Sequence, residues 1–121
     1  MLLRVVVDSP QEFDKWLENQ QRPAVENPAA REGKAVFLGQ SCINCHRVRG
    51  TNAKGNYAPD LTHLMSRQTL ASGMIPNDAT AENLREWIAD PQAVKPKCLM
   101  PAFALSDGDR TLLVRYLVTL H

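Results

Sequence analysis

Two cysteines and a histidine stand within five residues, in the segment Cys42-Ile43-Asn44-Cys45-His46. Thiols at positions i and i+3 lie on one side of a helical turn, where they can add to the two vinyl groups of a porphyrin. The next residue then brings an imidazole beneath the ring to the iron. This C-x-x-C-H spacing predicts covalent attachment of one c-type haem through Cys42 and Cys45, with His46 as an iron ligand.

Two other interpretations of the cysteine pair are weaker. A thioredoxin-like redox pair needs a strand–helix–strand setting, whereas residues 32–40, which precede the motif, have a helical pattern. A zinc site needs a second group of ligands, and the remaining candidates are scattered single residues, namely His63, Cys98 and His121. Haem attachment is therefore the preferred interpretation, and Cys98 is expected to be a small apolar filler.

A haem iron with one histidine ligand needs a second ligand on its other face, and the candidates are Met65, Met74, Met100, His63 and His121. Met65 lies at helical spacing with leucines and is expected to pack in the core. Met74 lies in an irregular stretch, and His63 is expected to be exposed or to cap a helix. Met100 lies in a loop with prolines on both sides, and a restrained loop can hold a thioether against iron at little entropic cost. We therefore predict Met100 as the second iron ligand.

The composition is that of an ordinary globular protein. The 121 residues suffice for one compact domain with an appendage, and 44% of them are hydrophobic and 22% charged. The balance of 14 basic against 13 acidic residues argues against a nucleic-acid-binding or acidic-membrane-binding protein. The apolar stretches Leu2–Val7 and Leu112–Leu120 each contain an arginine and fall short of the ~20 residues of a membrane span. We expect no span in this chain, and no secretory signal at its start.

Residues 1–26 are expected to form a strand, a helix and a linker. Leu2–Asp8 is rich in β-branched residues, which predicts a strand. Ser9, Pro10 and Glu12 form a capping-box pattern, which predicts a helix from Pro10 to about Gln21. The residues that follow contain two prolines and no apolar periodicity, as is typical of a linker.

Residues 27–121 are expected to form one all-α domain with long loops. Asn27, Asp60, Thr80 and Ser106 each precede an apolar periodic segment and are expected to cap helices. These helices are predicted over 28–38, 61–67, 81–89 and about 107–120, with a loop over 47–59. Such long loops are unusual in so small a domain unless a cofactor occupies the middle.

This domain resembles a class I cytochrome c, because C-x-x-C-H follows its first helix, a methionine stands in a proline-bounded loop, and an amphipathic helix closes the chain. In that family a glycine and an aromatic residue of the first helix cross an aromatic residue of the last. Gly33, Phe37 and Tyr116 match those positions. The family also uses a proline carbonyl to orient the histidine ligand, and Pro59 matches that proline.

Longer segments narrow the resemblance to the cytochrome c domain fused to subunit II of caa3-type cytochrome c oxidases; they are Pro59–Leu64, Ser66–Gly73, Leu84–Gln92 and Lys95-Pro96. The first residues, up to Gln21, resemble the last strand and following helix of the copper-binding cupredoxin domain of that subunit. Met1 stands where the family has a copper-ligand methionine, but the cysteine and histidine copper ligands have no counterpart here. The resemblance therefore implies that this sequence is a piece of a longer protein. No copper centre can form within this piece.

The resemblance also implies a function and its setting. Arg67 and Trp87 match positions expected to bind the haem propionates, although Trp87 can equally be a core residue. The domain is expected to take electrons one at a time from a soluble carrier and to pass them to the copper centre of the oxidase, with oxygen reduced in another subunit. Its expected location is the outer, periplasmic face of a bacterial cytoplasmic membrane, anchored by upstream segments.

Three other functions remain open on the residues alone. The chain can be an independent monohaem electron carrier with an N-terminal extension. It can be a haem sensor or enzyme whose iron has an open coordination position. It can also be a thiol redox module without haem.

Overall fold

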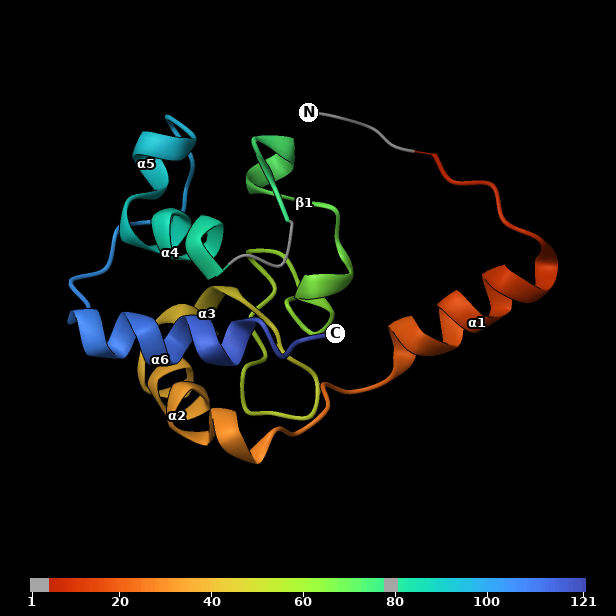
Figure 1. Cartoon of the computed structure of the whole chain (residues 1–121), viewed down its shortest axis with the longest axis horizontal. Helices are drawn as coiled ribbons and strands as arrows, with labels where there is room; N and C mark the ends of the chain where they lie inside the picture. The colour runs from red at the N-terminus through yellow and green to blue at the C-terminus, as the bar shows by residue number, and fades with distance from the viewer. Residues whose placement is uncertain (1–4, 78–80) are drawn as a thin grey trace.

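The computed structural model describes residues 5–77 and 81–121, and two of its helices cross at the lower left of the view in Figure 1. α2 (Arg31–Gly39) passes beneath α6 (Asp107–Leu117) at close range, because a Cβ added to Gly33 would lie only 1.9 Å from the carbonyl oxygen of Leu112. The rings of Phe37 and Tyr116 pack beside this contact, with centroids 5.7 Å apart. The crossing expected from the sequence is confirmed, and it joins the two ends of the domain.

The longer helices begin at the residues that the sequence marks as caps. Asn27 accepts a hydrogen bond from the backbone at the start of η1 (Pro28–Ala30), a short 3-10 helix that leads into α2. Ser106 does the same at the start of α6. α4 (Ala81–Ala89) has the predicted bounds and packs against α6, while its predicted cap, Thr80, lies outside the described residues.

Two short elements have no counterpart among the predicted ones. α5 (Pro91–Val94) follows α4 directly, because the Asp90 carboxylate accepts hydrogen bonds from two backbone N–H groups of its first turn. β1 (Thr69–Leu70) and β2 (Ile75–Pro76) pair as an antiparallel hairpin around the 3-10 helix η3 (Ala71–Gly73). The fold is thus mainly helical with one small sheet, and the all-α prediction is corrected to that extent.

The core fills the space between α2, α4 and α6 and the loops that join them. Leu120 lies beyond the end of α6 and has no exposed surface, and its carbonyl oxygen accepts a hydrogen bond from the Met65 N–H at 2.8 Å. Only the turn η2 (Leu64–Ser66) forms where a helix over 61–67 is predicted. The largest buried apolar side chains are those of Phe37, Val48, Leu64, Leu70, Leu84, Ile88, Leu113, Val114, Tyr116, Leu117 and Leu120.

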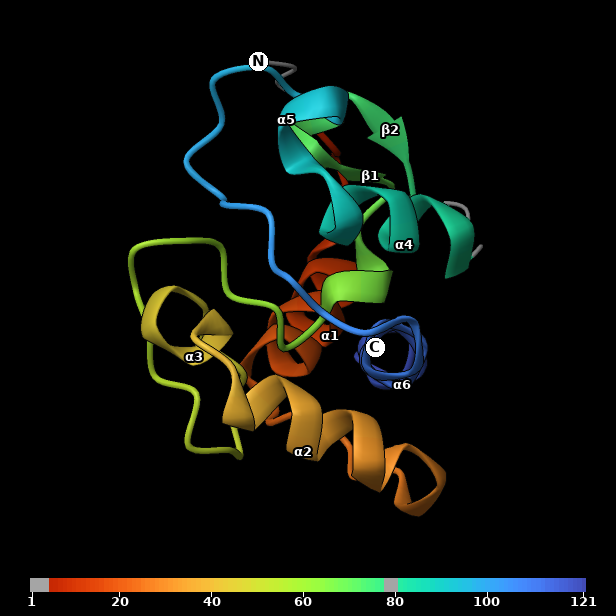
Figure 2. The same ribbon diagram turned by 90° about the vertical axis from the view of Figure 1, so that its left-hand side faces the viewer.

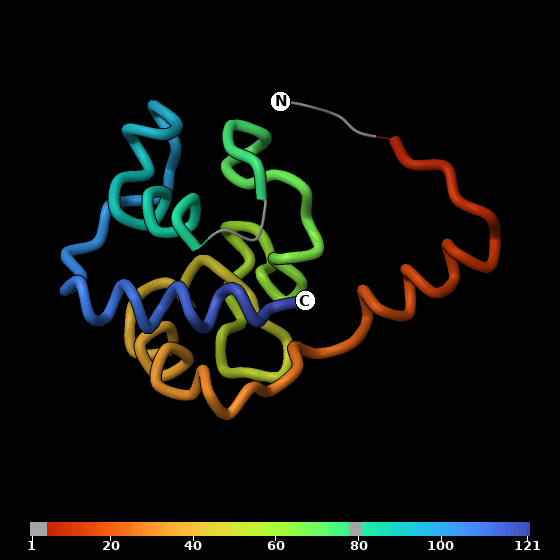
Figure 3. Tube along the Cα trace, in the orientation of Figure 1, coloured from red at the N-terminus to blue at the C-terminus, as the bar shows by residue number. Residues whose placement is uncertain are grey.

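The N-terminal helix stands apart from this core. α1 (Pro10–Gln21) has the predicted bounds and the predicted capping box between Ser9 and Glu12, yet none of its residues is buried. The trace in Figure 3 shows it projecting from the rest of the molecule. The predicted strand is wrong for residues 5–8, which form no strand, and residues 2–4 lie outside the described part. β-branched residues favour a strand only where a neighbouring strand can pair with it.

The linker after α1 is irregular, as predicted, but it is tied to the domain. The Arg49 guanidinium donates to the carbonyl oxygen of Gln20, and the backbone N–H of Ala24 donates to the carbonyl oxygen of Arg49 at 3.0 Å. The His63 ring lies 3.1 Å from the carbonyl oxygen of Arg22. α1 is therefore anchored at its C-terminal end. No helix within 5–77 or 81–121 is long and apolar enough to cross a membrane.

Candidate haem site

The two cysteines lie on a single helical turn. α3 (Cys42–Cys45) follows α2 after a break at Gln40 and Ser41, and it ends where the His46 N–H donates to the carbonyl oxygen of Cys42 at 2.9 Å. Both thiols are free and partly exposed, and burial raises the pKa of the Cys42 thiol. Two unpaired thiols one turn apart are arranged to bond the same flat ligand.

The imidazole of His46 is oriented by the backbone. Its Nδ1–H donates to the carbonyl oxygen of Pro59 at 2.8 Å, so Nε2 is the nitrogen with a lone pair available to a metal ion. Burial lowers the pKa of this imidazole, despite the hydrogen bond to Pro59, and the positive charge of Arg67 lowers it further. The neutral ring that these effects favour is the form that binds iron.

The loop after His46 folds back against the cysteine turn. The N–H of Gly55 donates to the carbonyl oxygen of His46 at 3.1 Å, and the N–H of Ala58 donates to that of Cys45 at 2.9 Å. A Cβ on Gly55 would lie 2.4 Å from the carbonyl carbon of Cys45, so only glycine fits without a shift of the backbone. Sequence reasoning treats Gly55 only as a loop residue, because nothing local marks this close approach.

Asp60, next to Pro59, is held from two sides. Its carboxylate accepts hydrogen bonds from the Thr62 N–H at 2.8 Å and the Thr62 hydroxyl at 2.5 Å, with the Arg49 guanidinium 3.8 Å away. Burial raises the pKa of Asp60, but the hydrogen bonds from Thr62 and the nearby arginine charges outweigh it, so the pKa falls below its usual value. Pro59 is thus followed by an anchored residue, which limits movement of the carbonyl that orients His46.

Arg67 and Trp87, predicted to bind propionates, are both partly buried. The Arg67 guanidinium donates to the backbone carbonyl oxygen of Asp60, and burial lowers its pKa. Trp87 packs against the hydrophobic core from α4. Arg67 therefore lies beside the His46 loop, whereas the contacts of Trp87 are those of a core residue.

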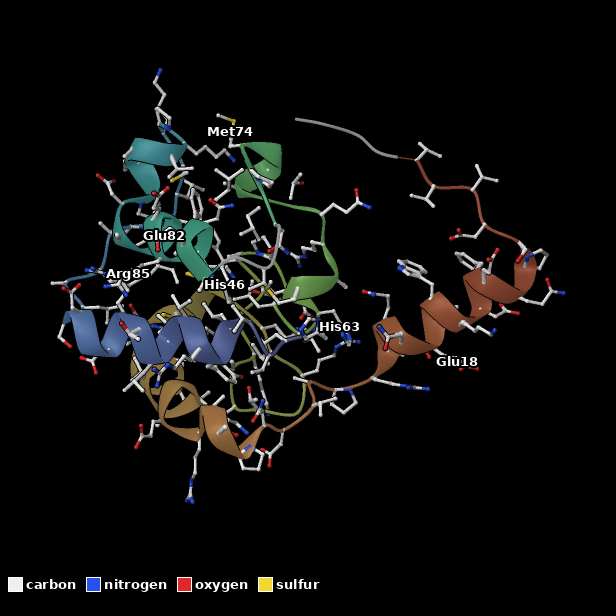
Figure 4. The ribbon with its side chains drawn as sticks, viewed as in Figure 1. Glu18, His46, His63, Met74, Glu82 and Arg85 are labelled. Atoms are coloured by element: carbon white, nitrogen blue, oxygen red, sulfur yellow. The ribbon has the colours of Figure 1, made fainter. Side chains whose placement is uncertain are left out.

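The candidates for the second ligand have different environments. Met65 packs against the core as predicted, whereas Met74 is 58% exposed and lies at the upper edge of the molecule, far from His46 in the view of Figure 4. His63 is buried rather than exposed, and its Nδ1 lies 2.7 Å from the carbonyl oxygen of His121. Met100 is partly buried in the segment between α5 and α6.

The residues present fit a covalently held porphyrin. α3 and the segment that joins α5 to α6 lie on the same side of the molecule in Figure 2. Several apolar side chains on the segments between α2 and α6 pack on the core but keep exposed surface; they are Ile43, Leu61, Met65, Ile75, Trp87, Met100 and Leu105. A large apolar ring would cover such surface. Within the described residues, no three His, Cys, Asp or Glu side chains group to hold a metal ion.

This combination of a helix crossing with a C-x-x-C-H turn defines the class of proteins that bind haem covalently. The chain belongs to the cytochrome c family, whose model matches residues 30–121. A cytochrome c domain carries haem c, so the family supplies the cofactor that the motif predicts.

Similar proteins fall into two groups by name. Cytochrome c oxidase subunit 2 of Alkalihalophilus pseudofirmus is 38% identical over 90% of this chain and 31% of its own length. The subunit 2 of Bacillus sp. strain PS3 is 34% identical over 90% of this chain and 32% of its own. A nitric oxide reductase subunit from Cereibacter sphaeroides is 37% identical over 70% of this chain and 55% of its own. The chain thus spans about a third of the oxidase subunits that it matches.

Proposed function

We propose that this chain transfers single electrons through one haem c, attached to Cys42 and Cys45 and ligated by His46 and Met100. The observation that carries the proposal is the arrangement at α3, where two free thiols on one turn precede an imidazole whose Nδ1 is bonded to the Pro59 carbonyl. That hydrogen bond fixes the ring orientation and increases the basicity of Nε2. Residues 27–121 form the proposed haem domain, in agreement with the family match from residue 30.

The roles of the residues follow from their chemistry. Bound haem c would supply a one-electron couple between ferric and ferrous iron. The thioether of Met100 is a soft ligand that favours the ferrous state, and ligation by both Met100 and His46 would leave no open position for oxygen or substrate. Arg67, beside the His46 loop, is a proposed partner for a propionate, because a guanidinium pairs well with a carboxylate. Trp87 is the second proposed propionate partner, through its indole N–H.

The ligand assignment is tested by the visible spectrum of the haem-loaded protein in both redox states. The ferric form is expected to show the weak far-red band of a thioether–iron bond, and Met100→Ala is expected to abolish it. Met74→Ala is the matched control, because Met74 is an exposed methionine from another part of the chain. A ferric spectrum without this band, or rapid binding of carbon monoxide to the ferrous form, would favour a sensor or enzyme with an open iron position.

We further propose that the parent protein is subunit 2 of a caa3-type oxidase, located on the periplasmic face of the membrane. The matches to the oxidase subunits extend over 90% of the chain, which is more than residues 30–121 comprise, whereas the match to the nitric oxide reductase extends over 70%. The oxidase likeness thus extends into the segment before the haem domain. The proposed electron donor is a small soluble redox protein, and the proposed acceptor is the copper centre of the parent protein.

The acceptor is tested by mixing the reduced haem-loaded protein with purified complexes in a stopped-flow instrument. A caa3-type oxidase is expected to oxidise the ferrous haem faster than a nitric oxide reductase does, and Met100→Ala is expected to slow the reaction. Faster oxidation by the reductase would assign the chain to that complex. Equal, slow oxidation by both would favour an independent carrier.

Residues 1–26 are proposed to be the end of a copper-binding cupredoxin domain and its linker. Phe13, Trp16 and Leu17 lie on one face of α1 with 38% or more of their surface exposed, and the ring centroids of Phe13 and Trp16 are 5.7 Å apart. Such an apolar face is normally covered by a neighbouring element. Trp16→Ser is therefore expected to change the unfolding free energy of this chain by less than about 0.5 kcal/mol. The same change in the full-length protein is expected to cost about 3 kcal/mol; equal effects would contradict the proposal.

A further inference from the structure

One side chain connects α5 to the segment that carries Met100. Gln92 occupies the second position of α5, and its Nε2 donates to the carbonyl oxygen of Cys98 at 2.7 Å. The same nitrogen lies 3.4 Å from the carbonyl oxygen of Met100. Its Oε1 accepts a hydrogen bond from the backbone N–H of Lys97 at 3.0 Å. The Oε1 end of the amide thus binds the backbone at Lys97, and its Nε2 end faces the carbonyl oxygens on the two sides of Leu99, the residue before the proposed ligand.

The backbone that Gln92 binds has an unfavourable conformation. Lys97 has a φ of +67°, in the left-handed region that residues with a Cβ rarely adopt. The bend at Lys97 turns the chain back toward α5, and the Lys97 N–H is the group that donates to Gln92. A conformation of this kind persists only where surrounding contacts over-determine it. Gln92 supplies such contacts before and after the bend.

Few other contacts hold this segment: the Lys95 ammonium donates to the Ser72 hydroxyl at 2.8 Å, and the side chains of Met100 and Leu105 pack, partly buried, against the core. From Gln92 to Leu112, all of which the structure describes, no residue is buried. The Cys98 N–H donates to the carbonyl oxygen of Lys95 at 3.1 Å, and the Cys98 thiol makes long contacts of 3.5 and 3.6 Å to the carbonyl oxygens of Pro91 and Met100. These contacts lie within the segment or at its start. Gln92 alone binds backbone groups at Lys97, Cys98 and Met100 together.

We infer that Gln92 is a positioning residue for the iron ligand Met100, because its amide fixes the Lys97 bend and the carbonyls of Cys98 and Met100. The inference rests on the proposed function, in which Met100 binds the haem iron. With Gln92 in place, the thioether is presented in a restricted range of positions, so less conformational entropy is lost when the bond to iron forms. Without it, other ligands compete more successfully for the iron.

The chain offers a matched control for this inference. Gln11 occupies the second position of α1 after Pro10, as Gln92 does in α5 after Pro91, and it is exposed on a helix that stands apart from the core. Gln92→Ala and Gln11→Ala therefore remove the same side chain from the same helical position. Ile88→Val adds a second control, because it trims a buried side chain of α4 without touching the Met100 segment.

The test measures the affinity of the ferric haem-loaded protein for imidazole, which competes with the thioether for iron. Gln92→Ala is expected to raise this affinity about tenfold, through loss of the hydrogen bonds that hold the segment. Gln11→Ala and Ile88→Val are expected to leave it within twofold, with covalent haem content unchanged in all variants. If Gln92 contributes only to stability, Gln92→Ala and Ile88→Val should both lower the unfolding midpoint and should have the same affinity for imidazole.

The outcomes separate the inference from the function on which it rests. If Met100→Ala abolishes the far-red band but Gln92→Ala binds imidazole like the unchanged protein, Gln92 is not a positioning residue and the electron-transfer proposal stands. If the band is absent or survives Met100→Ala, the ligand assignment fails, and the inference with it. Should Gln92→Ala fail to fold, amide hydrogen exchange in the unchanged protein decides, since a Lys97 N–H bound to Gln92 exchanges slowly and a free one does not.

Discussion

Residues 46–63 and residues 95–105 carry the two proposed iron ligands, and they are held in place by different means. The first segment folds back on the C-x-x-C-H turn, and Val48, Ala53 and Thr62 within it have at most 1% of their surface exposed. The second segment has no buried residue along its described length and is bound to α5 mainly through the side chain of Gln92. The His46 segment contributes fully buried residues to the core, whereas the Met100 segment packs only partly buried side chains against it.

The difference indicates when each ligand becomes fixed. Ordering a segment costs backbone entropy, which burial and internal hydrogen bonds offset for residues 46–63. We therefore expect the imidazole of His46 to be in position before any cofactor binds. Residues 95–105 include no buried residue, so we expect their order to depend largely on Gln92 and on the proposed bond between Met100 and iron. Damage to the first segment should lower the stability of the whole domain, whereas damage to the second should change ligand exchange at the iron.

The largest effect is expected from Gly55→Ala, in the His46 segment. The added Cβ would lie within 2.7 Å of three backbone atoms of Cys45 and His46, so the loop must move away from the turn. We expect a loss of about 3 kcal/mol in the free energy of unfolding, measured by denaturant titration of the haem-loaded protein. Gly108→Ala is the control, because its Cβ would meet nothing nearer than the Ser106 hydroxyl at 3.8 Å. Similar losses of unfolding free energy in both variants would contradict the view that close packing holds the His46 segment in place.

A smaller effect is expected from Thr62→Val, which keeps the shape of a fully buried side chain but removes its hydroxyl. The hydroxyl accepts from the Arg49 N–H at 2.9 Å and donates to Asp60, so the change leaves a backbone donor unsatisfied. We expect a loss of about 2 kcal/mol at neutral pH. Thr119→Val, which removes a single bond to the Tyr116 carbonyl on a partly exposed residue, is expected to cost less than half as much.

The pH dependence of the Thr62→Val effect gives an independent check. The pKa of Asp60 is below its usual value, so its contribution to stability is present above the pKa of the unfolded state and is lost as the pH falls through the folded pKa. Without the Thr62 hydroxyl that depression is smaller. The difference in unfolding free energy between the variant and the unchanged protein should therefore shrink as the pH is lowered. A difference that is constant with pH would mean that the Thr62–Asp60 bond does not act on the carboxylate.

The smallest effect is expected in the Met100 segment, from Lys97→Gly. Glycine adopts a φ of +67° without strain, and this gain slightly exceeds the entropy that glycine adds to the unfolded chain. We expect about 0.5 kcal/mol of stabilisation of the bend, seen as an imidazole affinity lowered about twofold. Lys97→Ala removes the same ammonium group but keeps a Cβ, so it should show no such gain. An equal change in both variants would assign the effect to the lysine charge instead.

Much of the fold could be predicted because its signals are local. The caps at Ser9, Asn27 and Ser106 mark helix starts within one turn of the residues that they bind, and C-x-x-C-H carries its chemistry in five residues. The strand over 2–8 could not be judged in the same way, because a strand depends on a partner elsewhere. Residues 5–8 have high β-propensity and no strand structure.

The features that the sequence patterns do not predict depend on contacts between distant parts of the chain. His63 is buried because it meets the carbonyl oxygens of Arg22 and His121, far away on either side in sequence. Gly55 is required by the approach of a loop to a turn ten residues earlier. Gln92 is an ordinary polar residue in the sequence, and its role follows only from the path of the chain after α5. Hydrophobic periodicity and capping patterns carry no information about such encounters.

The crossing of α2 and α6 also sets an order of events during synthesis. A chain emerges from its N-terminus, so the cysteine turn beside α2 is made well before the helix that α2 packs against. Until Leu112 and Tyr116 arrive, Gly33 and Phe37 have no partner and the interior stays open. In an unfinished chain the thiols are consequently accessible to their cofactor, and the backbone is accessible to proteases. The interior closes only when α6 has been made and has packed on α2, in those chains that have not been degraded before then.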